Sequence, residues 1–197
     1  MGLRDYYVAA VKGAILSQVE DVQIIDISHE IKPFNIVQAA FIVRNCWSSF
    51  PKGTVHIIGV NPDLNENTKH VIVVNDGHYF IGADNGFFSL IFDKIPDDVF
   101  ELNITQDNDE ITFPTKNLFV KAACHIARGG TPEVVGRRVK SVRQAQDFRP
   151  VIEEHVIKGT VVYIDNYGNV ITNISNSLFK EVGRGRDFAI MFKRASL

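Results

Sequence analysis

Cysteine is scarce in this sequence: only two of the 197 residues are cysteines, and no CxxC pair is present. Cys46 and Cys124 each lie in an apolar helical context, so we expect two buried free thiols rather than a disulfide framework or a zinc site. The sequence also lacks a signal-like apolar core near its start and any apolar run long enough to cross a bilayer. These absences favour a cytoplasmic protein that has no membrane partner.

Excess charge of either sign is also missing. The chain has 21 basic and 23 acidic side chains, for a formal net charge of -2, so no strong field favours nucleic acid or an anionic membrane. With 45% hydrophobic residues and only 14 glycines and 7 prolines, the composition is that of a folded globular chain. A small ligand of mixed or no charge fits this balance better than a nucleic acid.

The common cofactor and catalytic motifs are absent. There is no Walker loop, GxSxG, HExxH, or GxGxxG following a strand. The six histidines show no ligand spacing on any one element. Gly183-Arg184-Gly185 precedes a predicted strand rather than a helix, so it indicates a turn. We therefore expect neither a metal ion nor a bound cofactor.

Hydrophobic periodicity predicts the elements of the first part of the chain. Apolar residues at helical spacing predict a helix over residues 4–18, and apolar runs predict strands at residues 22–27 and 54–60. A second amphipathic helix is expected over residues 35–48, between these strands. Alternating strands and helices predict an α/β fold with a mostly parallel sheet flanked by helices.

The following segment adds an antiparallel edge. Residues 70–74 and 79–82 flank a turn whose Asp76-Gly77 pair is typical of a tight hairpin. A short helix is predicted at residues 85–92, a strand at 99–104, a helix at 118–127 and a brief helix beginning at Thr131.

A polar, non-periodic stretch at residues 141–154 is the best candidate linker. It predicts two domains, residues 1–150 and a smaller carboxy-terminal β domain over 151–197, with strands at 157–164, 170–174 and 187–192. So short a β segment buries too little surface to stand alone. It must pack on the first domain, on a neighbouring subunit or on sequence outside this chain.

Four polar loops could carry a ligand site. Those around Asp26, Asn61 and Asp84 each follow a predicted strand, where open α/β sheets bind ligands, but each could also be an ordinary loop. The loop from Asp165 to Ile174 is denser, because Tyr167 could stack on a base and Asn169 could bond an adenine edge. A plain hairpin turn explains that loop about equally well.

Taken in order, short segments along nearly the whole chain carry a resemblance. They are residues 2–8, 12–13, 25–33, 39–41, 50–56, 83–86, 112–113, 163–165 and 168–169. This series resembles the S-adenosyl-L-methionine (SAM) hydroxide adenosyltransferases, a family that also contains the SAM-dependent fluorinase and chlorinase. The resemblance implies an α/β amino-terminal domain, a small β domain, and a homotrimer with its sites between subunits.

The family's reaction implies a substrate and a set of contacts. SAM is displaced at ribose C5′ by water or halide, methionine leaves from a sulfonium, and positioning of the nucleophile is the main requirement. By position, the resemblance implies that the rings of Phe34 and Tyr167 lie near the ribose and adenine and that the amide of Asn169 contacts adenine. It implies that the carboxylates of Asp5 and Asp165 hold the methionine ammonium. Phe113 would be the wall beside C5′, and Thr115 the small polar residue there.

The positions expected to handle water depart from the family pattern. Hydrolytic members place Asp, Arg and His there, and this sequence has Asn61, Thr68 or the adjacent Lys69, and Pro114. Asn61 can orient a water but cannot take its proton, and Pro114 is neither acid nor base. A further ribose-binding carboxylate would precede Met1, and the last residues stop before segments that the family uses, so the chain resembles one short at both ends.

Four hypotheses follow. The first is a SAM hydrolase that forms adenosine and L-methionine, with Asn61, Thr68 and Lys69 as the catalytic set. The second is a SAM- or adenosine-binding homologue without turnover. A halide-using enzyme has less support, because Asn61 stands where fluorinase-like members have Tyr. The last is a fragment that neither forms a trimer nor binds a nucleoside.

Overall fold

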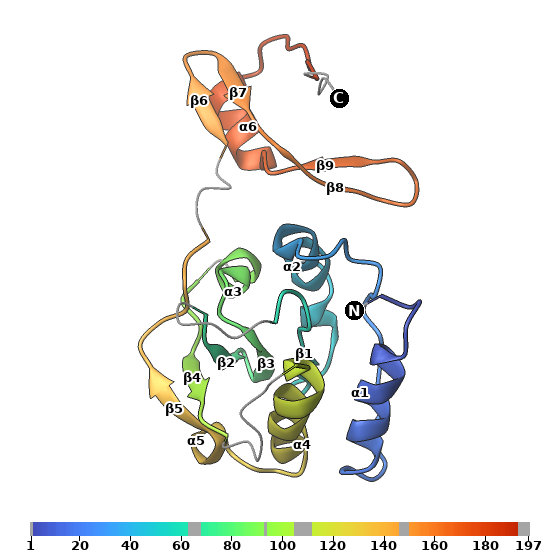
Figure 1. Ribbon diagram of the computed structural model, residues 1–197. Coiled ribbons are helices and arrows are strands. Elements are labelled where there is room, and N and C mark those ends of the chain that lie inside the picture. The colour runs from blue at the N-terminus through green and yellow to red at the C-terminus, as the bar shows by residue number, and fades with distance from the viewer. Residues whose placement is uncertain (1, 63–67, 93, 105–111, 146–149, 193–197) are drawn as a thin grey trace. The chain divides into compact units, whose positions relative to one another are not determined.

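The computed structural model describes residues 2–62, 68–92, 94–104, 112–145 and 150–192. The chain divides into two compact units, Met1–Gln146 and Asp147–Leu197, and Figure 1 labels the elements of each. The first unit contains a mixed sheet and its helices, and the second contains two small hairpins and a helix.

The sheet of the first unit has five strands in the order β1-β3-β2-β4-β5. Only β1 and β3 pair in parallel, and the other three pairings are antiparallel. The prediction of a mostly parallel sheet was therefore wrong, because residues 22–27 join no strand and β5 returns antiparallel to β4. The strands are β1 (Val55–Ile57), β2 (His70–Asn75), β3 (His78–Ala83), β4 (Asp98–Leu102) and β5 (Gly136–Val139).

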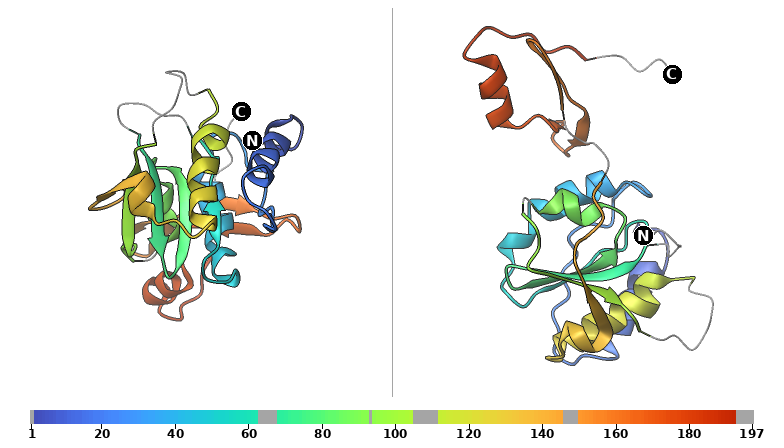
Figure 2. Two further views of the ribbon diagram at one scale, coloured as in Figure 1. Left: turned by 90° about the horizontal axis from the view of Figure 1, so that it is seen from below. Right: turned by 90° about the vertical axis from the view of Figure 1, so that its left-hand side faces the viewer.

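Helices cover both faces of this sheet, as Figure 2 shows. Strand residues alternate between the faces, so Val71 and Val73 pack in the core beneath α2 and α3, whereas Ile72 packs against η2 and α4. The helices are α1 (Tyr7–Leu16), α2 (Ile36–Arg44), η1 (Trp47–Ser49), α3 (Phe87–Ile91), η2 (Thr115–Phe119, a π-helix), α4 (Val120–Ala127) and α5 (Pro132–Val135).

The predicted hairpin is confirmed in β2 and β3. Its central residues, Asp76 and Gly77, have φ angles of 47° and 76°, as a two-residue turn of the primed type requires. The register pairs Asn75 with His78. The hairpin forms the centre of the sheet, so the expectation that it adds an antiparallel edge was wrong. A local turn signal was thus sufficient to fix this pairing.

An aromatic cluster fills the core near this turn. The rings of His56 and Phe80 stack with centroids 4.6 Å apart, and His56 Nε2 lies 3.3 Å from His78 Nδ1. Trp47 meets His78 edge-on at 5.1 Å between centroids. Burial, followed by the neighbouring His78, lowers the pKa of His56 to about 4, so His56 is neutral at pH 7.

In the second unit, β6 (Val151–Glu153) pairs with β7 (Val156–Lys158), and β8 (Val161–Ile164) pairs with β9 (Val170–Thr172). The single strand predicted at residues 157–164 is thus divided between two hairpins. Residues 187–192 form no strand, and the helix α6 (Asn176–Gly183) was not predicted. Ser175 starts that helix by accepting a hydrogen bond from the backbone of Leu178 at 3.1 Å.

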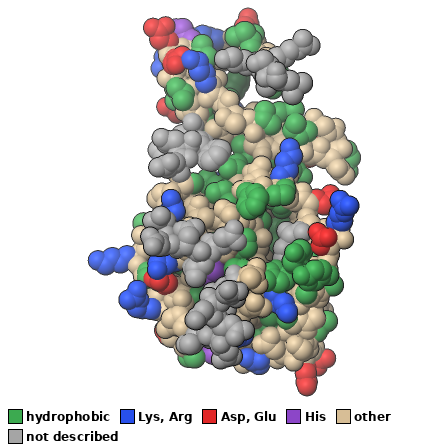
Figure 3. Space-filling view, in the orientation of Figure 1, with side chains coloured by type: hydrophobic (Ala, Val, Ile, Leu, Met, Phe, Trp, Pro, Cys, Tyr) green, Lys and Arg blue, Asp and Glu red, His purple; other side chains and the backbone are tan. Residues whose placement is uncertain are grey.

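Apolar side chains remain exposed in both units. Figure 3 shows them on the visible face of the first unit, in the region of α1, where Leu16 is 60% exposed. In the part of the second unit that the structure describes, no residue is fully buried, and Ile190 and Phe192 are widely exposed. Among all described residues, no helix has both the length and the apolar character needed to cross a bilayer.

Candidate functional site

Two polar loops, the one after β1 around Asn61 and the one after β3 around Asp84, meet at one edge of the sheet. Asn85, after β3, donates through its side-chain amide to the backbone carbonyl of Asn61 at 3.1 Å, and thereby ties the loop after β1 to the loop after β3. His70, at the start of β2, lies with Nε2 2.7 Å from the carbonyl oxygen of Pro62. The structure therefore brings the loops around Asn61 and Asp84 together, as their places after strands indicated.

The three predicted catalytic residues lie along these loops in different environments. Asn61 is half-buried with a positive φ of 47°, a conformation that asparagine adopts more readily than most residues. Thr68 is buried, whereas Lys69 is exposed and lies with Nζ 3.5 Å from Glu101 Oε1 on β4. Lys69 is thus directed towards a carboxylate of the sheet.

Asp84 is a titratable group at this edge that the predicted site omitted. Burial raises the pKa of its carboxyl group, although the backbone N–H of Arg143 donates to Oδ1 at 2.8 Å and offsets part of that rise. Its place at the end of β3, directly before Asn85, is the sequence signal that could have identified it.

Aromatic rings gather at the amino-terminal end of α1. Tyr6 and Tyr7 stack with centroids 4.6 Å apart, and Tyr7 meets Phe113 edge-on at 5.2 Å. Asp5 precedes this pair and is exposed. The structure thus brings Asp5 and Phe113 into one neighbourhood, and it adds two tyrosines that the predicted site did not include.

Thr115 stands at the start of the π-helix η2, two residues after Phe113. Its side chain is fully buried, and Oγ1 has no hydrogen-bond partner among the described residues. A buried hydroxyl without a partner lowers stability and calls for an explanation, and π-helical turns occur often at functional sites. Pro114, directly before it, is also buried and offers no proton donor or acceptor on its side chain.

Phe34 lies just before α2 with its ring exposed. Its φ is 63°, in the left-handed region that a phenylalanine seldom occupies, and 70% of the residue is accessible. Asn35 then starts α2 by accepting a hydrogen bond from the backbone of Gln38 at 2.9 Å. Strain of this kind persists where the surroundings impose it, and often where a side chain contacts a ligand.

The remaining predicted residues lie in the second unit, at the turn between β8 and β9. Asp165 accepts hydrogen bonds from the backbone of Tyr167 at 2.9 Å and from the side-chain amide of Asn169 at 2.7 Å. These bonds, led by that from the Asn169 side chain, lower the pKa of Asp165. Asp165 therefore organises the turn, in which Tyr167 is 93% exposed.

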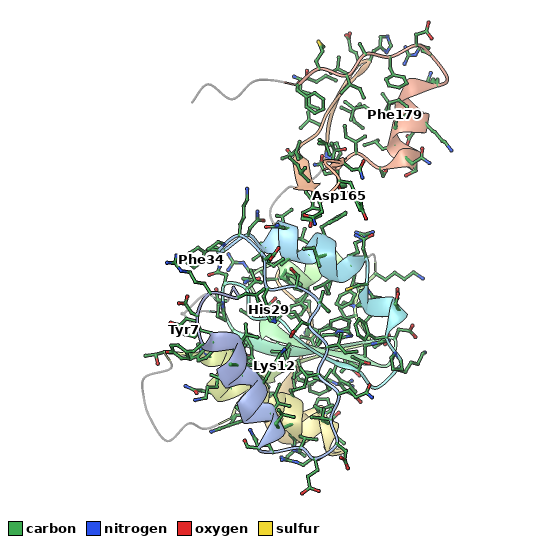
Figure 4. All side chains as sticks on the ribbon, turned by 90° about the vertical axis from the view of Figure 1, so that its right-hand side faces the viewer. Tyr7, Lys12, His29, Phe34, Asp165 and Phe179 are labelled. Carbon is green, nitrogen blue, oxygen red and sulfur yellow. The ribbon has the colours of Figure 1, made fainter. Side chains whose placement is uncertain are left out.

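A second polar cluster joins α1 to Asp26, within residues 22–27, and to His29, just after them. Asp26 Oδ2 accepts from Lys12 Nζ at 2.5 Å, and Asp26 Oδ1 lies 2.9 Å from His29 Nε2. The hydrogen bond from Lys12, followed by that from His29, lowers the pKa of Asp26. Figure 4 shows Lys12 on α1 and His29 on the neighbouring segment.

Comparison with known proteins finds that both parts of the chain match one protein family. Residues 1–136 match the SAM hydroxide adenosyltransferase N-terminal domain, and residues 159–196 match the C-terminal domain of the same family. The two matches correspond to the two ends of the chain and together cover most of it.

Two proteins named as SAM hydrolases and one named as a fluorinase are similar to this chain. An (R)-S-adenosyl-L-methionine hydrolase of Methanocaldococcus jannaschii is 28% identical over 88% of this chain, and one of Thermus thermophilus is 28% identical over 94%. A fluorinase of Nocardia brasiliensis is 26% identical over 94%. The chain covers 64%, 77% and 72% of these three proteins, in that order.

Solved structures share the fold. A crystal structure of an uncharacterized conserved protein from Thermotoga maritima aligns with a TM-score of 0.81 and 29% identity, over 92% of this chain and 72% of that chain. A conserved hypothetical protein from Thermus thermophilus aligns with a TM-score of 0.67 and 25% identity, over 87% of this chain and 70% of that chain.

Proposed function

Since the chain belongs to the SAM hydroxide adenosyltransferase family, we propose that it binds SAM and cleaves it with water into adenosine and L-methionine. The observation that carries this proposal is the match of both of its parts to the two domains of one family. The relatives named as (R)-SAM hydrolases support water as the nucleophile.

The substrate would be held by rings and carboxylates. Phe34 and Tyr167, whose faces are widely exposed, suit stacking on adenine and ribose, and the amide of Asn169 suits an adenine edge. The carboxylates of Asp5 and Asp165 suit the methionine ammonium. Asp165 already accepts hydrogen bonds from its own turn, so it would position Asn169 and Tyr167 as well as attract the cation.

The reaction needs a placed water more than a strong base. Water oxygen would form a bond to ribose C5′ as the C5′–S bond breaks, and the bonding pair would pass to sulfur, which leaves as the neutral thioether of methionine. The attacking oxygen then loses one proton. Asn61, Thr68 and Lys69 would hold the water near C5′, with Phe113 as a wall and the Thr115 hydroxyl as a further contact.

A second function has its own support. Asn61 and Pro114 carry no group that can accept the proton, which favours a protein that binds SAM or adenosine without turning it over. Halogenation has weaker support, which rests on the relatives named fluorinase.

Under the hydrolase proposal, Asp84 is a titratable carboxyl group at the same loop edge that could accept the proton, and burial raises its pKa.

Incubation of the purified chain with SAM tests these functions together. The hydrolase proposal expects adenosine and methionine in equal amounts, above the spontaneous rate and independent of chloride. If calorimetry detects SAM binding but no adenosine is formed, the chain binds SAM without cleaving it. A 5′-chloro product that depends on chloride would instead indicate a halogenase. Absence of binding to SAM, adenosine and methionine alike would contradict all three.

Tyr167→Ala provides a matched variant, because its ring is 93% exposed and its loss leaves the bonds of the turn in place. Stacking of a ring on a base contributes about 1–3 kcal/mol, so SAM binding should weaken by about five- to 150-fold. Phe179→Ala, on α6 of the same unit, is the control and should leave SAM affinity unchanged.

A further inference from the structure

Strand β1 ends the sheet with an open edge. Ile58 N–H donates to the Ile81 carbonyl and Tyr79 N–H donates to the Thr54 carbonyl, so the even-numbered residues of this segment face β3. Backbone groups alternate in direction along a strand, and those of Val55 and Ile57 therefore point away from β3. No further strand follows β1 in the described sheet.

Residues 22–27 form a second extended segment with open backbone groups. The sequence predicts a strand here, yet none of these residues makes a backbone hydrogen bond to another described residue. Ile25 is 63% exposed, although its neighbours Val22 and Ile24 are half-buried. Apolar side chains on both faces are typical of a strand covered on both sides, so this segment lacks the partner that its sequence fits.

A cavity lies between these two segments. It has a volume of about 410 Å³ and is lined by residues of both segments, together with α1, α2 and α4. Most of the lining is apolar, as in the side chains of Val11, Val22, Ile24, Val55, Ile57 and Cys124. We call this cavity the edge cleft.

We propose that the edge cleft is a binding site for an extended, mostly apolar peptide segment, which adds as a β-strand between residues 22–27 and β1. A strand in this place would pair with the groups of Val55 and Ile57 on one side and with residues 22–27 on the other. Its side chains would meet the apolar residues of the cleft.

The chemistry of the walls selects this occupant. An apolar small molecule would cover two rows of backbone N–H and C=O groups without pairing them, and each buried unpaired group lowers stability. A polypeptide backbone in the extended conformation carries donors and acceptors along both edges and satisfies both walls at once. The apolar lining further selects valine-, isoleucine- or leucine-rich segments over charged ones.

Hydrogen exchange of the whole chain tests this site without SAM. The probe is a synthetic peptide of consecutive valines with lysines at its ends for solubility. We expect amide exchange at residues 22–27 and at Val55 and Ile57 to slow by about tenfold at about ten times the dissociation constant. Exchange in the second unit should stay unchanged.

Two controls separate strand addition from apolar binding. The same peptide, N-methylated at alternate amides, keeps its side chains but loses N–H donors to the neighbouring strands. At about ten times the dissociation constant of the first peptide, it should protect the same amides from exchange at least tenfold less. Val55→Pro removes an N–H that faces the cleft and no bond to β3, so it should weaken the peptide while β2 and β3 keep their protection. Ile25→Pro tests the other wall if Val55→Pro fails to fold.

Three outcomes would overturn the proposal. If amide exchange is unchanged at the highest concentration at which the peptide dissolves, the edge cleft does not bind a strand. Equal protection by the methylated peptide would make the cleft an apolar pocket rather than a strand site. Protection of the same amides that grows with protein concentration, in the absence of peptide, would make a second copy of the chain the occupant.

Discussion

The Thr115 hydroxyl is buried at the beginning of η2 and has no hydrogen-bond partner among the described residues, and the proposed function gives it a role. Thr115→Val keeps the shape and removes the unsatisfied oxygen, so the free energy of unfolding should rise by roughly 1 kcal/mol. If the hydroxyl contacts the attacking water, kcat for adenosine formation should fall about a hundredfold. Chemical denaturation and a SAM turnover assay measure the two effects.

In Thr115→Val, a rise in stability together with a fall in kcat distinguishes a residue of the site from one that only packs. Thr115→Ser retains the hydroxyl and should keep most of the turnover while it loses stability through the missing methyl group. A Thr115→Val variant that is more stable and equally active would contradict a role for this hydroxyl.

His56 predicts how stability depends on pH. Its folded pKa, about 4, lies below the ordinary value of 6.5, because burial and His78 disfavour the charged form. The unfolded chain therefore binds more protons between these values, so this contribution to stability is complete above pH 6.5 and is lost as the pH falls towards 4. His56→Phe keeps the stack on Phe80 and should flatten the dependence of the unfolding midpoint on pH in that window.

His155 is the matched control for this measurement, because it is an exposed histidine of the second unit. His155→Gln should leave the pH dependence of unfolding of the first unit unchanged. If the stability of His56→Phe falls as steeply with decreasing pH as that of the original chain, groups other than His56 cause the pH dependence.

Among the elements, α2 depends on its first residue. The Asn35 side chain accepts from Gln38 N–H and satisfies one of the unpaired donors at the helix start. Asn35→Ala should lower the free energy of unfolding by about 1 kcal/mol. Asn45→Ala at the opposite end removes only a bond from an exposed amide to the Phe41 carbonyl and should change stability less. Equal losses in denaturant titrations would contradict the cap.

Elements with local signals were the ones that the sequence could predict. The hairpin of β2 and β3 depends on the Asp76-Gly77 turn and its flanking apolar residues, and α1 depends on helical periodicity, so both were expected and both are found. Residues 22–27 and 187–192 have equally good strand patterns, but neither segment pairs with a strand among the described residues, and a pattern alone cannot supply that partner. The helix α6 was missed because its apolar residues are few.

The candidate site was partly predictable for a similar reason. Positions such as Phe34 and Thr115 came from a resemblance spread along the chain, whereas their strain and missing partner appear only in three dimensions. The contact of Tyr7 with Phe113 and the burial of Asp84 join segments distant in sequence, so no short motif announced them.

At the scale of the whole molecule, the second unit favours association. None of its described residues is fully buried, and it exposes apolar side chains such as Val151, Ile164 and Phe188. The resemblance to the family implies a homotrimer, for which sedimentation equilibrium should give three times the chain mass of 22.1 kDa. Replacing Phe188 by Ser should shift the mass towards that of the single chain, and Tyr167→Ala should not. A single-chain mass across micromolar concentrations would contradict the trimer.

The edge-on contact of Trp47 with His78 gives the molecule a built-in optical signal. The sequence has one tryptophan, which lies in the first unit, so indole emission follows that unit alone while the second is silent at the same wavelengths. A charged imidazolium quenches indole more than a neutral ring does. Emission intensity therefore records the charging of His78 in the intact chain, separately from any change in the second unit.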